Sequence, residues 1–181
     1  LHQTLKYFKD RLSVVNPGAS FVAEAWPKLG EPDYSSFITR ITSAKPDVLF
    51  SYLWGADFVG FTRQAKPYGL FDRMKVGTLL FMDDLKALGQ DMPNGVYGQM
   101  RAPFFAMEGK AISDFTERYR ARFNDWPADW AIMAYESMLV YAEGIRKANS
   151  VEAQPLTQAM EKAEFDLLRG KTRRSEEHTS E

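Results

Sequence analysis

Side chains that could carry acid–base or nucleophilic chemistry are few and scattered in this sequence. It contains no cysteine and two histidines, His2 and His178, which stand near opposite ends of the chain. A cysteine nucleophile, a histidine triad and a histidine zinc site are therefore all disfavoured. Asp83 and Asp84 are adjacent, and neighbouring side chains on a helix or strand point apart, so acids at a helix start are a better interpretation than a catalytic pair.

The sequence motifs of common enzyme classes do not occur either. There is no glycine-rich dinucleotide loop, no P-loop, no nucleophile elbow and no paired-histidine zinc motif. We therefore expect no enzymatic activity, no catalytic residue, no metal site and no cofactor. An α/β enzyme that uses the carboxylates near Asp83 is the least favoured alternative. The remaining helical acids are expected on solvated faces: Asp114, Glu117, Glu143 and Glu161.

The aromatic residues are more informative than the acids. Trp54 and Gly55 directly follow the apolar run 48–53, where a strand is expected to end. In an open α/β sheet ligands bind at the carboxyl ends of the strands, so Trp54 is a candidate wall of a binding site. Asp57, just inside the next expected helix, either caps that helix or meets a ligand ammonium group, and the cap is the simpler interpretation.

The other tryptophans also stand at the ends of expected elements. Trp26 ends an apolar stretch before a proline, and Trp126 and Trp130 flank the tripeptide PAD at the entry to a long helix. A single tryptophan more often packs in a core than lines a ligand site, because it buries a large area. Core packing and ligand contact both stay open for each of them at this point.

The composition indicates a folded chain and disfavours some classes of binding partner. The 181 residues are 45% hydrophobic and 14% aromatic, which is ample for a packed core. The net charge is −1 and no basic stripe with interleaved aromatics occurs, so nucleic acid is not an expected partner. No apolar stretch approaches the roughly 20 residues of a membrane span.

The first part of the chain alternates between helical and strand patterns. Helical spacing of apolar residues occurs over 5–12, 37–41 and 58–65, and apolar strand-like runs occur over 21–26, 48–53 and 74–80. This alternation is typical of a parallel sheet with crossover helices. The strands are almost continuously apolar, as expected for strands that are covered on both faces.

The pattern changes after about residue 81, where one short helical piece and several turn signals precede consecutive helices. Ile112, Phe115, Tyr119 and Phe123 share one face of the first long helix. A shorter helix is expected near 155–163, and the change of pattern places a boundary near 98–103. The second long helix has a broad apolar face: Trp130, Ala134, Tyr135, Met138, Leu139, Ala142 and Ile145.

The last eight residues, Arg174 to Glu181, differ from everything before them. They read RSEEHTSE, lack any apolar periodicity, and coincide with a translation of a common sequencing adapter. We therefore expect residues 174–181 to be a non-native tail outside the fold.

Three stretches of the sequence resemble one protein family. They read DYSSFITRITSAKPDVLFSYLWGADFVGFTRQAKPYGL, then ALGQDMPNGVYG, then ISDFTERYRARFNDWPADWAIMAYESMLVYAEGIRKANS. In this order they resemble the substrate-binding proteins of branched-chain amino-acid-type ABC importers. The resemblance extends from Leu1 to about Thr172.

The resemblance implies a type I periplasmic binding protein fold, in which two α/β lobes close on a small molecule. We expect the α/β class: a three-layer lobe with a parallel sheet, followed by helices of the other lobe. Residues 1–98 would form most of the second lobe, and 99–170 the crossover and the helices that pack on the first lobe. The first lobe's sheet and the second lobe's first strand would lie upstream, which makes this C-terminal part an incomplete two-lobed trap.

The resemblance also implies site residues. Trp54, with Gly55 beside it, matches the aromatic position that follows the family's PDvvf strand, and Trp130 matches an aromatic position at the start of the long helix. The loop after the third strand normally offers an acid to the ligand's ammonium group. Leu79 stands at that position, with Asp83 a few residues further on. This departure argues against leucine, isoleucine or valine as the ligand.

The expected function is capture of a small amino-acid-like or related polar ligand by the extracytoplasmic solute-binding component of an ABC importer. The implied partners are that ligand and the importer's permease subunits. The implied location is the periplasm, with a signal peptide expected upstream of Leu1. A ligand-sensing receptor or regulator domain of the same fold is the alternative.

Overall fold

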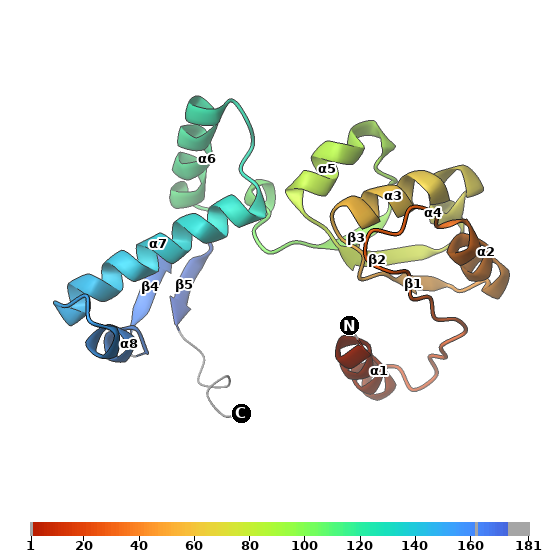
Figure 1. Ribbon diagram of the computed structural model, residues 1–181, viewed down its shortest axis with the longest axis horizontal. Coiled ribbons are helices and arrows are strands. Elements are labelled where there is room, and N and C mark those ends of the chain that lie inside the picture. The colour runs from red at the N-terminus through yellow and green to blue at the C-terminus, as the bar shows by residue number, and fades with distance from the viewer. Residues whose placement is uncertain (1, 162, 174–181) are drawn as a thin grey trace. The chain divides into compact units, whose positions relative to one another are not determined.

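The computed structural model describes residues 2–161 and 163–173, so the predicted non-native tail at 174–181 lies outside the described residues (Figure 1). By its internal contacts the chain divides into two compact units, Leu1–Gln99 and Met100–Glu181. Each unit is described by itself.

A parallel three-stranded sheet organises the first unit. Its strands are β1 (Val48–Phe50), β2 (Lys75–Leu79) and β3 (Val96–Gln99), in the order β1-β2-β3. Parallel neighbours need a long crossover, and helices α3 (Ala56–Ala65) and α5 (Met82–Leu88) lie in the two crossovers. Figure 1 shows both helices on one side of the sheet and α1 (His2–Val15) on the other. The ring of Phe8 on α1 stacks on Phe50 of β1, with 4.3 Å between ring centroids.

The core of this unit lies between the sheet and the helices α2 (Ser35–Ala44) and α3. Phe58, Phe61, Thr62 and Ala65 are buried at the helical spacing that the sequence predicts. The chain then passes through a 3-10 turn, Lys66–Tyr68, and the short helix α4 (Leu70–Arg73) into β2. The buried cluster consists of Tyr34, Ile38, Ile41, Phe61, Ala65, Leu70, Met74 and Val76.

The strand predicted at 21–26 is not present: this segment is irregular. A strand is stable only when a neighbour completes its hydrogen-bond ladder, and the described residues place no strand beside this segment. Its aromatic side chains contact α1 instead. Phe21 packs edge-on against Phe8, and Trp26 lies against His2 with 4.2 Å between ring centroids.

Strand β3 was missed by the sequence analysis, because its apolar pattern is weak and two glycines flank Tyr97 within four residues. Its place in the sheet depends on a close approach. A Cβ on Gly98 would stand 2.7 Å from Cδ2 of Leu80, so only glycine fits there without displacing that side chain. The predicted start of α5 is confirmed, since Asp83 and Asp84 lie in its first turn. The buried Asp84 carboxylate accepts the backbone N–H of Phe81 at 2.9 Å.

Three helices and a hairpin build the second unit. The helices are α6 (Lys110–Phe123), α7 (Asp129–Ala148) and α8 (Ala153–Glu161), as the sequence predicts to within a few residues. A 3-10 turn, Phe104–Ala106, precedes α6. The antiparallel hairpin of β4 (Glu164–Leu167) and β5 (Gly170–Arg173) was not predicted. The buried cluster consists of Ala102, Ile112, Phe115, Ile132 and Leu168.

Helix α7 buries one face within this unit and leaves its predicted apolar face largely uncovered. Ile132, Glu136 and Gly144 are buried, while five residues of the apolar face are exposed: Trp130, Ala134, Met138, Leu139 and Ala142. Helix α8 packs against α7 at Gly144. A Cβ on Gly144 would stand 2.7 Å from Cγ of Met160 and 2.9 Å from Cδ1 of Leu156, so the helices meet where α7 has no side chain.

Two buried acids on α7 hold the segments on either side of it. Asp129 Oδ1 accepts the backbone N–H groups of Arg101 (3.1 Å) and Ala102 (2.9 Å). Glu136 accepts the backbone N–H of Arg169 (2.9 Å) through Oε1 and its guanidinium Nε (2.6 Å) through Oε2. Both acids are at most 2% exposed. They therefore fasten the segment before α6 and the turn of the β4–β5 hairpin to one helix.

In the first unit, Asp57 has a similar role. Its Oδ1 accepts the backbone N–H of Gly30 at 3.0 Å and the hydroxyl of the buried Tyr34 at 3.1 Å. The prediction that Asp57 caps α3 is wrong: Gly55 is the N-cap, with no side-chain cap. Asp57 lies inside the first turn, where its carboxylate faces the loop before α2 rather than the helix's own first amides.

We expect Arg169→Ala to lower the free energy of unfolding by about 2–3 kcal/mol, since it removes a hydrogen bond to a buried charge. The matched control is Arg146→Ala. Arg146 pairs with Glu143 at 2.8 Å on the surface, with its side chain 76% exposed, and such pairs contribute less than about 1 kcal/mol. Denaturant unfolding followed by far-UV circular dichroism measures both, and equal losses would contradict the anchoring role of Glu136.

Tyr34 predicts a pH dependence of stability. Burial and then the hydrogen bond to Asp57 raise the pKa of its hydroxyl above the ordinary value of 10.0. Below that value Tyr34 is protonated in both states, so it adds no pH dependence. Above it the unfolded chain releases the proton and the folded protein does not, so stability falls as pH rises.

The variant Tyr34→Phe isolates this effect, because every other tyrosine is unchanged. We expect it to lose about 1 kcal/mol at neutral pH from the missing hydrogen bond. Between about pH 9 and pH 11 its stability should fall less than that of the unmodified protein. Denaturant midpoints across this range provide the comparison. Identical pH profiles for the two proteins would mean that Tyr34 does not hold its proton in the folded state.

Candidate functional site

The carboxyl end of β1 places Trp54 at the edge of the sheet. After Phe50 the ladder continues through one more bond, from Ser51 N–H to the Gly77 carbonyl at 2.8 Å. The Ser51 hydroxyl then accepts the N–H of Leu53 at 3.2 Å and turns the chain out of the strand, which is why β1 is shorter than the predicted run 48–53. Trp54 follows with 51% of its surface exposed.

Gly55 provides the turn from this edge into α3. Its backbone has φ 59° and ψ −138°, a conformation that glycine adopts far more easily than other residues. No atom lies within 4 Å of the place where a Cβ would stand, so the constraint is conformational rather than steric. The turn leaves the backbone beside Trp54 uncovered, which is what close approach of a ligand requires.

Leu79 ends the neighbouring strand at the same edge. It is the last residue of β2, is half-buried, and lies opposite Gln99 of β3. Two residues further on, the ring of Phe81 meets Trp54 edge-on, with 6.5 Å between centroids and 81° between planes. Phe81 is a further candidate at this edge that the sequence did not indicate, although it follows a strand end just as Trp54 does. The described edge is thus apolar and aromatic, with Asp83 exposed beside it.

Trp130 lies in the second unit, in the first turn of α7, and is 51% exposed. The guanidinium carbon of Arg101 lies over its ring, 5.4 Å from the centroid. The backbone N–H of Arg101 donates to the carboxylate of Asp129, the residue before Trp130, and this bond holds Arg101 in place. An exposed indole and a cation are therefore fixed together at this helix start. No local pattern in the sequence indicates Arg101, because its contact with Trp130 depends on the path of the segment before α6.

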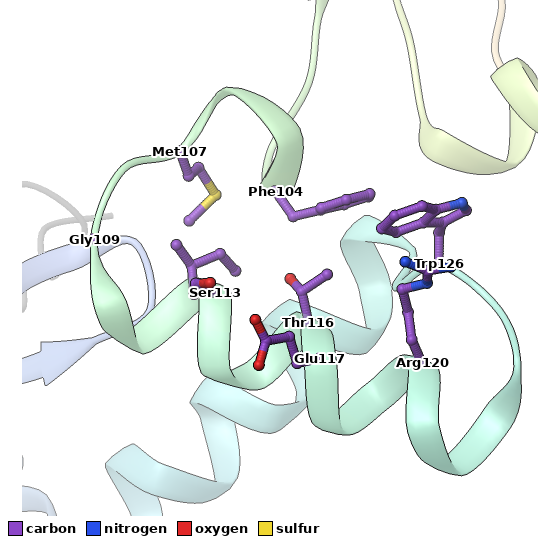
Figure 2. Close-up of a pocket in the computed structure, with 9 residues that line it drawn as sticks. Phe104, Met107, Gly109, Ser113, Thr116, Glu117, Arg120 and Trp126 are labelled. Atoms are coloured by element: carbon purple, nitrogen blue, oxygen red, sulfur yellow. The ribbon is translucent and has the colours of Figure 1, made fainter.

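The other two predicted tryptophans have packing roles in the described residues. Trp26 lies against His2. Trp126 stacks on Phe104 with 5.3 Å between centroids, and the Arg120 guanidinium lies 3.8 Å from its ring centroid. Figure 2 shows Phe104, Arg120 and Trp126 at one end of a pocket of about 390 Å³ over α6. Trp126 lines this pocket, whereas the residues that the resemblance implies for the site do not.

The part of the chain that the structure describes holds no cluster of three or more acids and histidines that could bind a metal ion. Within that same part, no helix is long and apolar enough to cross a membrane. The buried acids Asp84, Asp129 and Glu136 and the half-buried Asp57 all accept backbone N–H groups.

Comparison with solved structures shows the same fold. The amino acid ABC transporter substrate-binding protein of Pseudomonas fluorescens Pf-5 superposes with a TM-score of 0.81 at 21% identity, over 93% of this chain and 45% of that one. A leucine-binding protein of Thermotoga maritima MSB8 gives 0.78 at 16% identity, over 94% and 48%. A solute-binding protein of an R. palustris ABC transporter, in complex with benzoate, gives 0.77 at 16% identity, over 92% and 46%.

The chain thus spans a little under half the length of these structures, which are solute-binding proteins and not enzymes. Their likeness confirms the predicted α/β class and type I periplasmic binding fold. The family model described as periplasmic binding protein matches residues 11–181. By this match, which covers most of its length, the chain belongs to the periplasmic binding protein family.

Proposed function

We propose that this chain is part of a two-lobed trap that captures a small solute outside the cytoplasm and delivers it to an ABC importer. The observation that carries the proposal is the exposed Trp54 at the carboxyl edge of a parallel sheet, in a chain of this family. A tryptophan that leaves half of its surface in water at that edge is available to cover a ligand.

The ligand we propose is a small amino-acid-like or related polar molecule with an apolar or aromatic part. The edge formed by Trp54, Leu79 and Phe81 favours contact with such a part. Structural neighbours are named as binding an amino acid, leucine, benzoate or 3,4-dihydroxybenzoic acid, so the same fold serves both ligand classes. The absence of an acid at Leu79 favours an aromatic or other organic acid over leucine, isoleucine or valine.

We infer that Trp54, Gly55 and Leu79 form one wall of the site and that Trp130 contributes from the second unit. The permease subunits of the importer are the proposed partners, and the periplasm is the proposed location. Both follow from the family and not from any contact in this chain. The supporting fact for a non-enzymatic role is that the buried acids serve as hydrogen-bond acceptors for the backbone.

The ligand class is tested by a thermal-shift screen of amino acids and aromatic acids. The protein used is the two-lobed protein, that is, this chain together with the segment that completes the trap. A ligand at one hundred times its Kd stabilises the native state by about 2.7 kcal/mol, which a melting curve detects. The chain alone supplies one part of the trap, so we expect no saturable binding to it at micromolar ligand. Micromolar binding to the chain alone would contradict the two-lobed site.

We expect Trp54→Ala in the two-lobed protein to weaken binding of the screened ligand about tenfold or more, because it uncovers the ligand's apolar surface. Its stability should fall by less than the roughly 3–5 kcal/mol that a core tryptophan costs. Tyr68→Ala is the matched control, since Tyr68 is 54% exposed in the turn before α4. Titration calorimetry and denaturant melts separate the two effects. Unchanged affinity with a large loss of stability would move Trp54 into the core.

A further inference from the structure

The loop before α2 is held on α3 by hydrogen bonds to the side chains of Asp57 and Gln64, and the Gly30 N–H reaches both carboxylate oxygens of Asp57. Asp57 accepts the N–H of Gly30 and the hydroxyl of Tyr34 at 3.0 and 3.1 Å. About two turns further along α3, the Gln64 side chain accepts the N–H of Tyr34 at 2.8 Å and donates to the Pro32 carbonyl at 3.1 Å. The two side chains stand seven residues apart on α3, so they face the same side of the helix.

These bonds fix a turn whose tip is a solvated leucine. Gly30 has φ 72°, a left-handed conformation that places the preceding residue at the tip of the turn. That residue, Leu29, is 85% exposed. The hydrogen bonds give this turn a defined position, whereas the exposed Leu29 side chain adds little to stability. The combination indicates a surface whose position matters.

The turn is hydrogen-bonded to the first turn of α3, the helix that begins two residues after Trp54. Asp57, which binds Gly30, is three residues after Trp54, and Gly55 between them begins α3. Leu29 and Trp54 therefore flank the start of the same helix. The hydrogen bond from Gly30 forms because the Asp57 carboxylate is directed away from the first amides of α3 and towards the loop.

We propose that Asp57 is a positioning residue, which holds the Leu29–Gly30 turn as a second wall of the ligand site, and that Leu29 is the side chain it presents to the ligand. This inference rests on the proposed function. It assigns Asp57 a role through hydrogen-bond geometry, not through charge. A direct pairing of Asp57 with a ligand ammonium group is the interpretation that it replaces.

The geometry supplies a sharp test, because one oxygen of Asp57 makes both close contacts. Asp57→Asn keeps an acceptor oxygen in that place and removes the charge, whereas Asp57→Ala removes both. In the unmodified chain the Gly30 amide should be protected from hydrogen exchange. We expect the Asp57→Asn variant to keep that protection. The Asp57→Ala variant should exchange the Gly30 amide at least about tenfold faster, since the turn opens locally when the acceptor is lost.

Affinity is measured in the two-lobed protein with L-leucine and benzoate as probes. For the probe that binds, we expect Asp57→Asn to stay within about twofold of the unmodified protein and Asp57→Ala to lose about fivefold or more. Leu29→Ala should lose a similar amount without any loss of stability, because the side chain is almost fully solvated. Val15→Ala, at an apolar position 62% exposed on α1, is the matched control and should change nothing.

Several results would overturn the proposal. If Asp57→Asn and Asp57→Ala weaken binding equally while Asp57→Asn keeps the Gly30 amide protected, Asp57 contacts the ligand through its charge. If Asp57→Ala opens the turn and affinity is unchanged, the turn is no part of the site. If neither variant alters Gly30 exchange, Asp57 does not hold the turn, and this result stands even when both probes fail to bind and the proposed ligand class is wrong.

Discussion

The parallel ladder of β1, β2 and β3 is the constraint on which the first unit depends. Parallel pairing forces every connection to cross back over the sheet, and it brings all three carboxyl ends to one edge. Trp54 and Phe81 meet for that reason, because Trp54 follows the end of β1 and Phe81 follows Leu79 at the end of β2. The crossovers also decide where the core forms, since α3 must return along the face that α2 covers. The parallel pairing of the strands therefore accounts both for the candidate ligand edge and for the position of the buried core.

Buried carboxylates hold irregular segments of the chain in both units. Asp84, Asp129 and Glu136 each accept a backbone N–H from a segment that has no ladder or helix to satisfy it. An ionised acceptor binds an amide more strongly than a neutral one, which offsets the cost of burial. The irregular connections, which position the exposed aromatic residues, are therefore held by charge-assisted hydrogen bonds and not by apolar packing alone.

The elements with strong helical spacing could be predicted from sequence, and so could Trp54 at a strand end. The segment 21–26 could not be assigned, because its apolar residues satisfy a strand pattern without a neighbour to pair with. Hydrophobic spacing identified the apolar face of α7, but not the close packing of α8 on this helix at Gly144, which depends on the path of the chain after α7. The roles of Asp57 and Arg101 depend on loop paths, which no local pattern encodes. Resemblance gave the family and the fold, and the wall residues stay predictions.

Gly144 also bears on the order in which the second unit assembles. A glycine inside a helix costs about 1 kcal/mol of helix propensity relative to alanine, so the C-terminal half of α7 is the weaker half before it has a partner. Contact with Leu156 and Met160 of α8 compensates for that weakness, but only after the chain has turned at Asn149. The N-terminal half, which has no interior glycine, can become helical early. The C-terminal half is then expected to form in the same kinetic step as α8, and mutations there should slow folding only where that step limits the rate.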